Sequence, residues 1–300
     1  MSKLLNPRQS MRERIKFLLS VAAPSERMVV VDVGANPVHP PPYAGLMKAL
    51  GCTVVGFEPQ EEAYAALVEA AAENEVYVQA ALGKPGKGTL HLYPTDGFTS
   101  LYRLHLPCLN FLGRFHRQLR DERTIEVELK GMDKIKEVPM VDLLKIDVQG
   151  AELDIIQSGK KKLSEAVVII PEMRFYQLYE NEPTLGDLDN ELRKMGFVLH
   201  KFLPAKEAPL PSSQAARLSK KVVRSQWIDG DAVYIRNMEN IDDWSADQLK
   251  HLALSAGTVF DSQDLCVRCL DHLVNRKEID ASVPAAYVDL LPPYYLAEAE

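Results

Sequence analysis

Cysteine is scarce in this sequence, with four residues in a chain of 300. Domains that depend on a disulfide framework carry far more cysteine, so that class of fold is excluded. Two of the four, Cys266 and Cys269, form a lone C-x-x-C within a segment of helical periodicity. We interpret them as small apolar residues on a helix, with a metal or redox role as the alternative.

Long apolar runs are also missing. No stretch reaches the ~18 apolar residues that a membrane-spanning helix needs, and the amino-terminal segment lacks the hydrophobic region and cleavage pattern of a signal peptide. We therefore expect no membrane span and a cytoplasmic location. The chain has 42 acidic and 35 basic residues, a formal charge of −7. As a whole it is a poor partner for nucleic acid or an anionic membrane.

What the sequence does contain is the pattern of a folded α/β protein. From Met28 onward, short β-branched runs alternate with amphipathic segments, which is typical of a mainly parallel sheet with crossover helices. We predict seven strands, at residues 28–34, 53–59, 76–82, 141–148, 166–170, 197–202 and 231–236. Apolar residues at helical spacing predict helices at residues 10–22, 43–50, 60–73, 150–163 and 185–195.

Two stretches interrupt this alternation and divide the chain. Residues 83–135 are too long for a bare connection and contain two further strand-like runs, at 89–94 and 124–130. Residues 203–226 are rich in proline, serine and lysine. We expect a helical segment at 1–27, a catalytic domain at 28–236 with these two insertions, and a helical appendage at 237–300. The apolar faces of that appendage either cover the edge of the sheet or form a homodimer.

Small residues follow the first predicted strand, in the run VDVGAN at residues 31–36. Open α/β sheets bind nucleosides at this position, where a ligand can approach the backbone. Glu58, in GFEPQ, lies at the end of the second predicted strand, where a carboxylate can bind both ribose hydroxyls. We therefore expect an adenosine-type ligand. The alternative is that Asp32 and Glu58 only cap the structure that follows them.

The loop after Gly34 lacks the G-x-G-x-x-G pattern that holds a pyrophosphate. It contains four prolines, which have no N–H to donate to a phosphate. A nicotinamide-dependent oxidoreductase is therefore disfavoured. S-adenosylmethionine has no phosphate and carries a sulfonium and an ammonium, so it suits an acidic loop of this kind better.

A second signal is VDLLKIDVQGAELDII at residues 141–156, where a predicted strand ends at Asp147 and a helix follows. Glu152 falls in the first turn of this helix, where a carboxylate complements the helix dipole. With VDVGAN and GFEPQ, this segment resembles the FkbM-type methyltransferase family, whose pattern is D-x-G-A-N, a strand-end F-E-P and K-I-D-x-x-G-x-E. The resemblance runs through GFTSL, PEMRFYQLY and DGDAVYIR and covers residues 28–236.

The resemblance implies a Rossmann-like class I methyltransferase fold that uses S-adenosylmethionine, typically to methylate a hydroxyl of a sugar or another small natural product. It also implies donor-binding positions at the strand ends. Those at the methionyl end would be Asp32, Gly34, Ala35 and Asn36. Those at the ribose and adenine would be Glu58, Pro59, Ala80 and Ala81, with Asp147 at the locus of methyl transfer.

Methylation of a hydroxyl requires a base, and Asp147 is our first candidate, with Glu172 and His39 as competitors. Asp147 could instead bind the acceptor, a cation or the ammonium of the donor. No H-x-x-x-H or clustered carboxylate pattern occurs, so we expect no metal site. An N-methyltransferase of a small amine and a catalytically silent donor-binding protein are the alternative functions.

Both insertions are basic within an acidic chain. Residues 103–123 contain five arginines, among them Arg103, Arg114 and Arg117, and residues 201–226 contain six basic residues against Glu207. Acceptor specificity in this architecture usually comes from such insertions. We expect them to bind an anionic acceptor, such as a phosphorylated or uronic-acid-bearing sugar. The alternative is that these charges form solvated surfaces.

Overall fold

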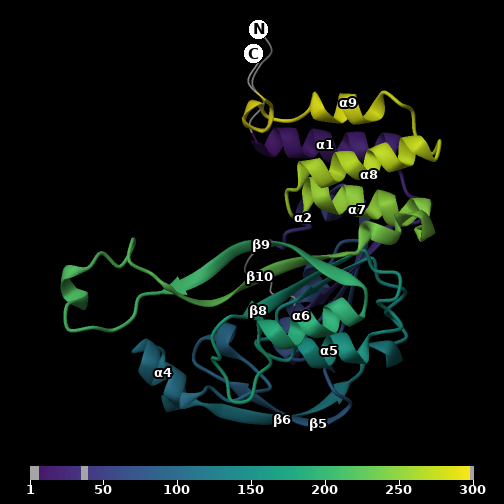
Figure 1. The fold of residues 1–300 in the computed structure, drawn as a ribbon. Helices are drawn as coiled ribbons and strands as arrows, with labels where there is room; N and C mark the ends of the chain where they lie inside the picture. Colours follow the sequence, from purple (N-terminus) through teal and green to yellow (C-terminus); the bar gives the residue numbers. More distant parts are fainter. Residues whose placement is uncertain (1–6, 35–39, 298–300) are drawn as a thin grey trace.

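The computed structural model describes residues 7–34 and 40–297. Its centre is a seven-stranded sheet with the strand order β3-β2-β1-β7-β8-β10-β9 (Figure 1). All neighbouring pairs are parallel except those of β10, which runs antiparallel to both β8 and β9. The strands are β1 Met28–Val33, β2 Cys52–Phe57, β3 Glu75–Val78, β7 Leu143–Ile146, β8 Val168–Arg174, β9 Phe197–Ala208 and β10 Gln226–Arg236. The predicted Rossmann-like class I methyltransferase fold is confirmed.

The strand register brings three strand ends to one edge of the sheet. Val33, the last residue of β1, is paired with Phe57 at the end of β2 and with Ile146 at the end of β7. The central strands are buried on both faces, as expected for parallel strands covered by helices. The residues that follow these three strands therefore meet at the carboxyl edge, where α/β sheets bind their ligands.

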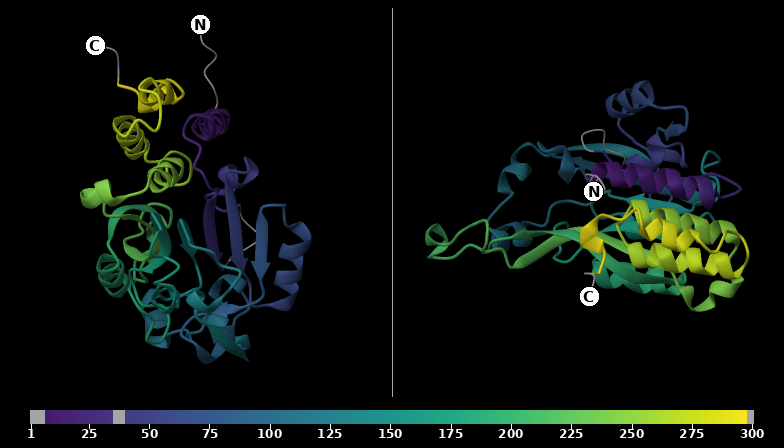
Figure 2. Two further views of the ribbon diagram at one scale, coloured as in Figure 1. Left: turned by 90° about the vertical axis from the view of Figure 1, so that its right-hand side faces the viewer. Right: turned by 90° about the horizontal axis from the view of Figure 1, so that it is seen from above.

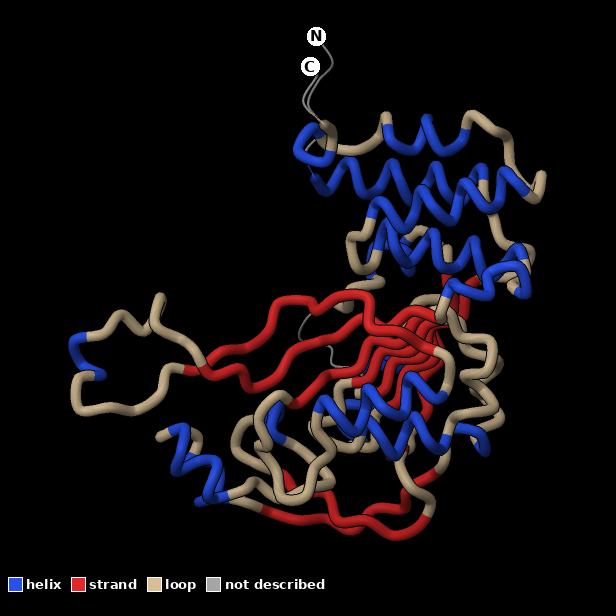
Figure 3. Tube along the Cα trace, viewed as in Figure 1, coloured by secondary structure: helices blue, strands red, loops and turns tan. Residues whose placement is uncertain are grey.

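Helices cover both faces of the sheet and make a three-layer arrangement (Figures 1 and 3). On one face, α5 and α6 pack against the core cluster that includes Val31, Leu144 and Tyr234. On the other, α1, α2, α7 and α8 pack against the cluster that includes Met28 and Leu143. The helices are α1 Pro7–Val21, α2 Ala44–Lys48, α3 Glu61–Ala70, α4 Leu106–Leu112, α5 Glu152–Ser158, α6 Leu185–Lys194, α7 Ala246–Thr258, α8 Gln263–Asn275 and α9 Val283–Val288.

The carboxyl-terminal helices belong to the main core. Their leucines at positions 249, 252, 265 and 270 are buried, and they share one cluster with Ile15 and Leu18 of α1 and with residues of the sheet. These four leucines are therefore used within the chain, whereas Tyr294 and Leu296 of the closing LLPPYYL run are exposed. Cys266 and Cys269 are buried in the same cluster, and burial raises the pKa of Cys266 to about 12. A thiol with such a pKa is unreactive at neutral pH, which supports the apolar interpretation.

Among the helices within residues 7–34 and 40–297, none is long and apolar enough to cross a membrane.

The first insertion contains a small three-stranded sheet of order β4-β6-β5, with β4 Ala81–Leu82, β5 Gly86–Leu92 and β6 Arg123–Lys130. The two extra strands predicted there are confirmed. The prediction of a single strand at 76–82 is wrong, because β3 ends at Val78 and Ala81 pairs with β6 instead. The Ala80 amide donates to the carbonyl of Val78 at 3.0 Å, and this tight turn sends the apolar run from one sheet to the other.

The second insertion continues a β-hairpin. Strands β9 and β10 remain paired out to Ala208 and Gln226, well beyond the predicted strand at 197–202 and the predicted start at 231. The connecting residues 209–225, which we call the hairpin loop, project past the rest of the sheet (Figures 1 and 2). The hairpin and α4 thus extend from the same side of the molecule, beyond the carboxyl edge.

Candidate functional site

The ends of β1 and β7 are in close backbone contact. The Asp147 amide donates to the carbonyl of Val33 at 2.9 Å. Gly34 follows with φ +89°, and a Cβ at this position would lie 2.1 Å from the Asp147 carbonyl oxygen. Only glycine can occupy this point, because any side chain would overlap the neighbouring backbone. The result is a close backbone contact between the two strand ends.

Asp32, two residues before Gly34, stabilises this end of β1. Its carboxylate is buried and accepts a hydrogen bond from the Tyr43 hydroxyl. Burial is the main cause that raises the pKa of both groups. The bond ties the segment that leads into α2 back to β1. Asp32 therefore stabilises the end of β1, and the donor-facing role expected of it stays a prediction.

The predicted ribose and adenine positions lie along the neighbouring strand ends. Glu58, directly after β2, is half-buried, and its carboxylate accepts the Gln60 amide at 2.8 Å. Burial raises the pKa of this carboxyl group. Pro59 is half-buried beside it, while Ala80 is buried in the turn after β3 and Ala81 begins β4. The predicted residues Ala35, Asn36 and His39 lie outside the described residues.

Lys145 is a buried cation under the same edge. Its ammonium lies 3.1 Å from the Asp231 carboxylate of β10. Burial opposes the charge of Lys145, yet the carboxylates of Asp147, Asp231 and Asp32 outweigh this and raise its pKa. The ammonium therefore balances the acidic side chains that gather at the ends of β1 and β7.

The loop after β7 places Gln149 in the site. Gln149 has φ +59°, and this conformation is held from both sides. The buried Glu152 carboxylate accepts the amides of Val148 and Gly150 at 3.0–3.1 Å. Ser100 donates its hydroxyl to the carbonyl of Gln149 at 2.6 Å. Glu152, which we expected to complement the helix dipole, thus fixes the loop that leads into α5.

Gln149 connects Asp147 with a buried charge network. Its side-chain amide donates to Asp147 at 2.7 Å and to Glu172 at 2.8 Å, and its oxygen accepts from Arg174 at 2.8 Å. Asp147 itself is exposed at the carboxyl edge. The carboxylate predicted to act on the substrate is therefore accessible, and its orientation is set by a side chain that is itself held in place.

Arg174, at the end of β8, is the centre of this network. Its guanidinium is 2.9 Å from Glu172, 3.1 Å from Glu182 and 2.8 Å from Asp229. Lys206 adds a second cation, 3.2 Å from Glu172 and 2.9 Å from Asp229. Three carboxylates thus share two cations in a largely buried cluster. Such a cluster is stable only if its hydrogen bonds are complete or if one carboxyl group keeps its proton.

Glu172 is the group that keeps a proton most readily. Burial raises its pKa to about 8, and the nearby carboxylates of Asp147 and Asp229 contribute, although Arg174 and Lys206 act in the opposite direction. The pKa of Glu182 is also raised, to about 7, chiefly by burial. Each oxygen of Glu172 already has a hydrogen-bond partner. These contacts describe an anchoring group for Gln149 and Arg174 better than a base open to substrate.

Glu172→Gln should flatten the pH dependence of stability. Between its ordinary pKa of 4.5 and about 8, the folded protein binds the Glu172 proton more tightly than the unfolded chain does. The free energy of unfolding should therefore fall as the pH rises through this window, and glutamine should remove much of the fall. Urea unfolding at several pH values measures the slope. Glu128→Gln, at an exposed position of β6, is the control. An unchanged slope in Glu172→Gln would assign the proton to another group.

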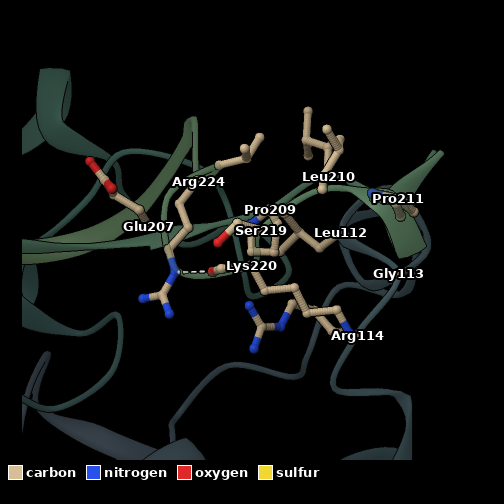
Figure 4. A pocket seen from close by; sticks show the side chains of 13 residues that line it. Leu112, Gly113, Arg114, Glu207, Pro209, Leu210, Pro211, Ser219, Lys220 and Arg224 are labelled. Carbon is tan, nitrogen blue, oxygen red and sulfur yellow. Dashed lines mark hydrogen bonds between the residues drawn. The ribbon is translucent and has the colours of Figure 1, made fainter.

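The three arginines predicted to bind the acceptor are placed differently. Arg103 is ion-paired with Glu122 at 3.2 Å, beside the small sheet. Arg117 is exposed in a short 3-10 helix after α4. Arg114 lies over the ring of Phe115 and lines a pocket against the hairpin loop (Figure 4). The two basic insertions therefore meet at Arg114.

Sequence reasoning assigned no role to several residues that shape the site. They are Lys145, Gln149, Arg174, Glu182 and Asp229. Some stand in segments that carried the family resemblance, since Lys145 and Gln149 belong to KIDVQG and Arg174 to PEMR. The signal that the sequence offered was a basic residue within an apolar strand, next to strand-end carboxylates. The side chains that pair with these basic residues, however, come from distant parts of the chain. Lys206 was counted among the basic residues expected to bind the acceptor, but it is paired with Glu172 and Asp229.

The family comparison gives one match. The model described as methyltransferase FkbM domain matches residues 32–199. This range is more than half of the chain and runs from the end of β1 to the start of β9. It therefore includes the strand ends, the Gln149 loop and Arg174. No curated protein matches the chain.

Several solved structures resemble the chain at low identity. Precorrin-6y C5,15-methyltransferase from Geobacter metallireducens has a TM-score of 0.32 and 15% identity, over 79% of this chain and 92% of that one. A putative S-adenosylmethionine-dependent methyltransferase from Listeria monocytogenes has a TM-score of 0.38 and 9% identity, over 77% and 98%. Magnesium protoporphyrin IX methyltransferase from Synechocystis has a TM-score of 0.32 and 11% identity, over 77% and 79%.

Proposed function

Because the chain belongs to the FkbM methyltransferase family, we propose that it transfers a methyl group from S-adenosylmethionine to a hydroxyl of a sugar or another small, anionic acceptor. The observation that carries this proposal is the contact between the strand ends at Gly34 and Asp147. It joins the two strand ends directly beside an exposed carboxylate. A donor bound at these strand ends would present its methyl group next to a candidate base.

The residues of the carboxyl edge fit the chemistry of the donor. Gly34 lets the ends of β1 and β7 approach each other at the proposed methionyl site, and Glu58, half-buried on the adjacent strand end, can accept hydrogen bonds from the ribose hydroxyls. S-adenosylmethionine supplies a methyl group already activated on a sulfonium sulfur. The protein therefore has to align donor and acceptor and to remove one proton.

Asp147 is the best-placed residue for that proton. As the bond from sulfur to methyl breaks and the bond from the acceptor oxygen to methyl forms, the hydroxyl proton would pass to the Asp147 carboxylate. Gln149 donates to one oxygen of this carboxylate at 2.7 Å and orients it. Glu172 is less suitable because it is buried and bonded to Gln149, Arg174 and Lys206.

Glu58→Ala should weaken binding of S-adenosylmethionine by about 1–3 kcal/mol, because charge-assisted bonds to the ribose are lost and their partners are left unpaired. Isothermal titration calorimetry with the donor measures the change. Glu69→Ala, which removes an exposed carboxylate from α3, is the matched control and should bind normally. Equal affinity in the two variants would show that Glu58 does not hold the ribose.

Two other functions remain distinguishable by the same assays. A catalytically silent protein would bind the donor but transfer no label from methyl-labelled S-adenosylmethionine to any compound in a cell extract. A methyltransferase of small amines would label an amine, and mass spectrometry of the product would place the methyl group on nitrogen.

A further inference from the structure

The two insertions build a groove beyond the carboxyl edge. It has a volume of about 520 Å³, which is the size of a small-molecule site, and it lies between the end of α4 and the hairpin loop. The two walls are in contact, because Gly113, the left-handed residue that ends α4, packs against Pro211. A Cβ on Gly113 would lie 3.1 Å from the Pro211 ring. We call this space the hairpin groove.

The lining of the hairpin groove is apolar and positively charged. Its apolar residues are Leu112, Pro209, Leu210, Pro211, Leu218 and Val223. Its cations are Arg114, Lys220 and Arg224, which Figure 4 shows on the side of the pocket away from Leu210. The Arg224 side chain donates to the Lys220 carbonyl at 2.7 Å, which holds its guanidinium against the loop.

No acidic side chain in the lining opposes these cations directly. The Glu207 carboxylate points away from them in Figure 4 and accepts the Trp227 indole N–H at 2.9 Å. The hairpin loop itself contains four basic and no acidic residues, in a chain whose net charge is −7. This local excess of cations favours an anionic ligand.

The hairpin groove lies on the same β-hairpin as Lys206, which is paired with Glu172. Hydrogen bonds lead from Asp147 through Gln149 to Glu172, and Glu172 is paired with Lys206 of β9. Glu207, the next residue along β9, lines the groove. An acceptor with its hydroxyl at Asp147 would have to extend along this hairpin, past Lys206, to reach the groove with its far end.

We propose that the hairpin groove binds the far end of the acceptor and that this end is amphiphilic, with an anionic group joined to an apolar chain. Arg114, Lys220 and Arg224 contact the phosphate, sulfate or carboxylate. The apolar chain packs on the leucines and prolines of the lining. That the ligand is the methyl acceptor rests on the function proposed above, whereas the binding chemistry of the groove is independent of it.

Trp227 provides a reporter for a direct test. It is 43% exposed and bonded to the groove residue Glu207, whereas the other tryptophan, Trp244, is buried in the core. The full chain, without donor, is titrated with dodecyl phosphate below its micelle concentration while the tryptophan fluorescence is followed. We expect a saturable change in the tryptophan fluorescence, and this change should be absent in Trp227→Phe. Dodecyl maltoside, which lacks the charge, and inorganic phosphate, which lacks the chain, should both bind more weakly.

Charge variants then locate the site. Lys220→Gln with Arg224→Gln should weaken dodecyl phosphate binding roughly tenfold, because two charge-assisted contacts are lost. Lys84→Gln with Lys87→Gln removes two exposed lysines near the small sheet and should leave binding unchanged. Equal affinity in both double variants would overturn the proposal, as would equal affinity for dodecyl maltoside.

A further experiment distinguishes a groove that binds a single ligand molecule from a surface that binds a lipid bilayer. Flotation with phosphatidylglycerol vesicles, combined with no saturable binding of monomeric dodecyl phosphate, would overturn the proposal in favour of a membrane contact. Donor binding is measured separately by calorimetry. Failure of donor binding with intact dodecyl phosphate binding would therefore refute the proposed function and leave the groove chemistry standing.

Discussion

Gly34→Ala should abolish measurable binding of S-adenosylmethionine and lower the free energy of unfolding by roughly 3–5 kcal/mol, the range of severe single substitutions. The added methyl would lie 2.1 Å from the Asp147 carbonyl oxygen, and the φ of +89° is strained for any residue with a Cβ. Strands β1 and β7 would have to separate at the point where we place the donor. Urea unfolding and calorimetry measure the two effects.

Gly186→Ala is the matched control for this substitution. Gly186 lies in α6, its φ is not in the left-handed region, and a Cβ there would meet nothing within 4 Å. Alanine should therefore leave donor binding intact and raise stability slightly, by roughly 0.5–1 kcal/mol. If Gly34→Ala behaved like Gly186→Ala, the close contact between the strand ends would not be needed for donor binding.

Asp147→Asn should reduce turnover by about 10²–10⁴-fold, the usual contribution of a general base, with little change in donor affinity. Asparagine keeps the shape of aspartate and an oxygen for the Gln149 amide, but it cannot accept the acceptor's proton. Single-turnover transfer of a labelled methyl group measures the rate, and calorimetry measures the affinity.

Asp243→Asn, which removes an exposed carboxylate far along the chain from the site, should keep full activity. An equal loss of turnover and of donor affinity in Asp147→Asn would reassign Asp147 to donor binding. Unchanged turnover would remove it from the mechanism and leave the base to be found elsewhere at the carboxyl edge.

Sequence patterns located the strand ends well because each of them is a local signal. MVVVDVG and TVVGFEP combine a β-branched run with small or acidic residues, and the strands predicted there, 28–34 and 53–59, end within one or two residues of the observed β1 and β2. The prediction of the third strand was wrong because the local signal was missing. VYVQAAL contains neither glycine nor proline, so nothing local revealed that the chain turns at Ala80 and enters the second sheet.

The charge network could not be predicted because its pairs are distant in sequence. Arg174 meets Asp229, 55 positions further on, only because β8 and β10 are antiparallel neighbours in this register. Gln149 was not predicted to have a role, because it is uncharged and occupies an unspecified position of the family pattern between Asp147 and Gly150. Its importance arises from the position of its amide between Asp147 and Glu172, which depends on the loop conformation and not on residue type.

The layer that covers one face of the sheet is shared by the two ends of the chain. Helix α1 packs against α7 and α9, and the Ser10 hydroxyl donates to the Leu290 carbonyl at 2.8 Å. Because α1 is synthesised long before α7 and α9, its apolar face and the sheet face beneath α7 and α8 stay uncovered until those later helices have been made. This face of the core can therefore be completed only after the carboxyl-terminal helices have been made, however early α1 itself forms.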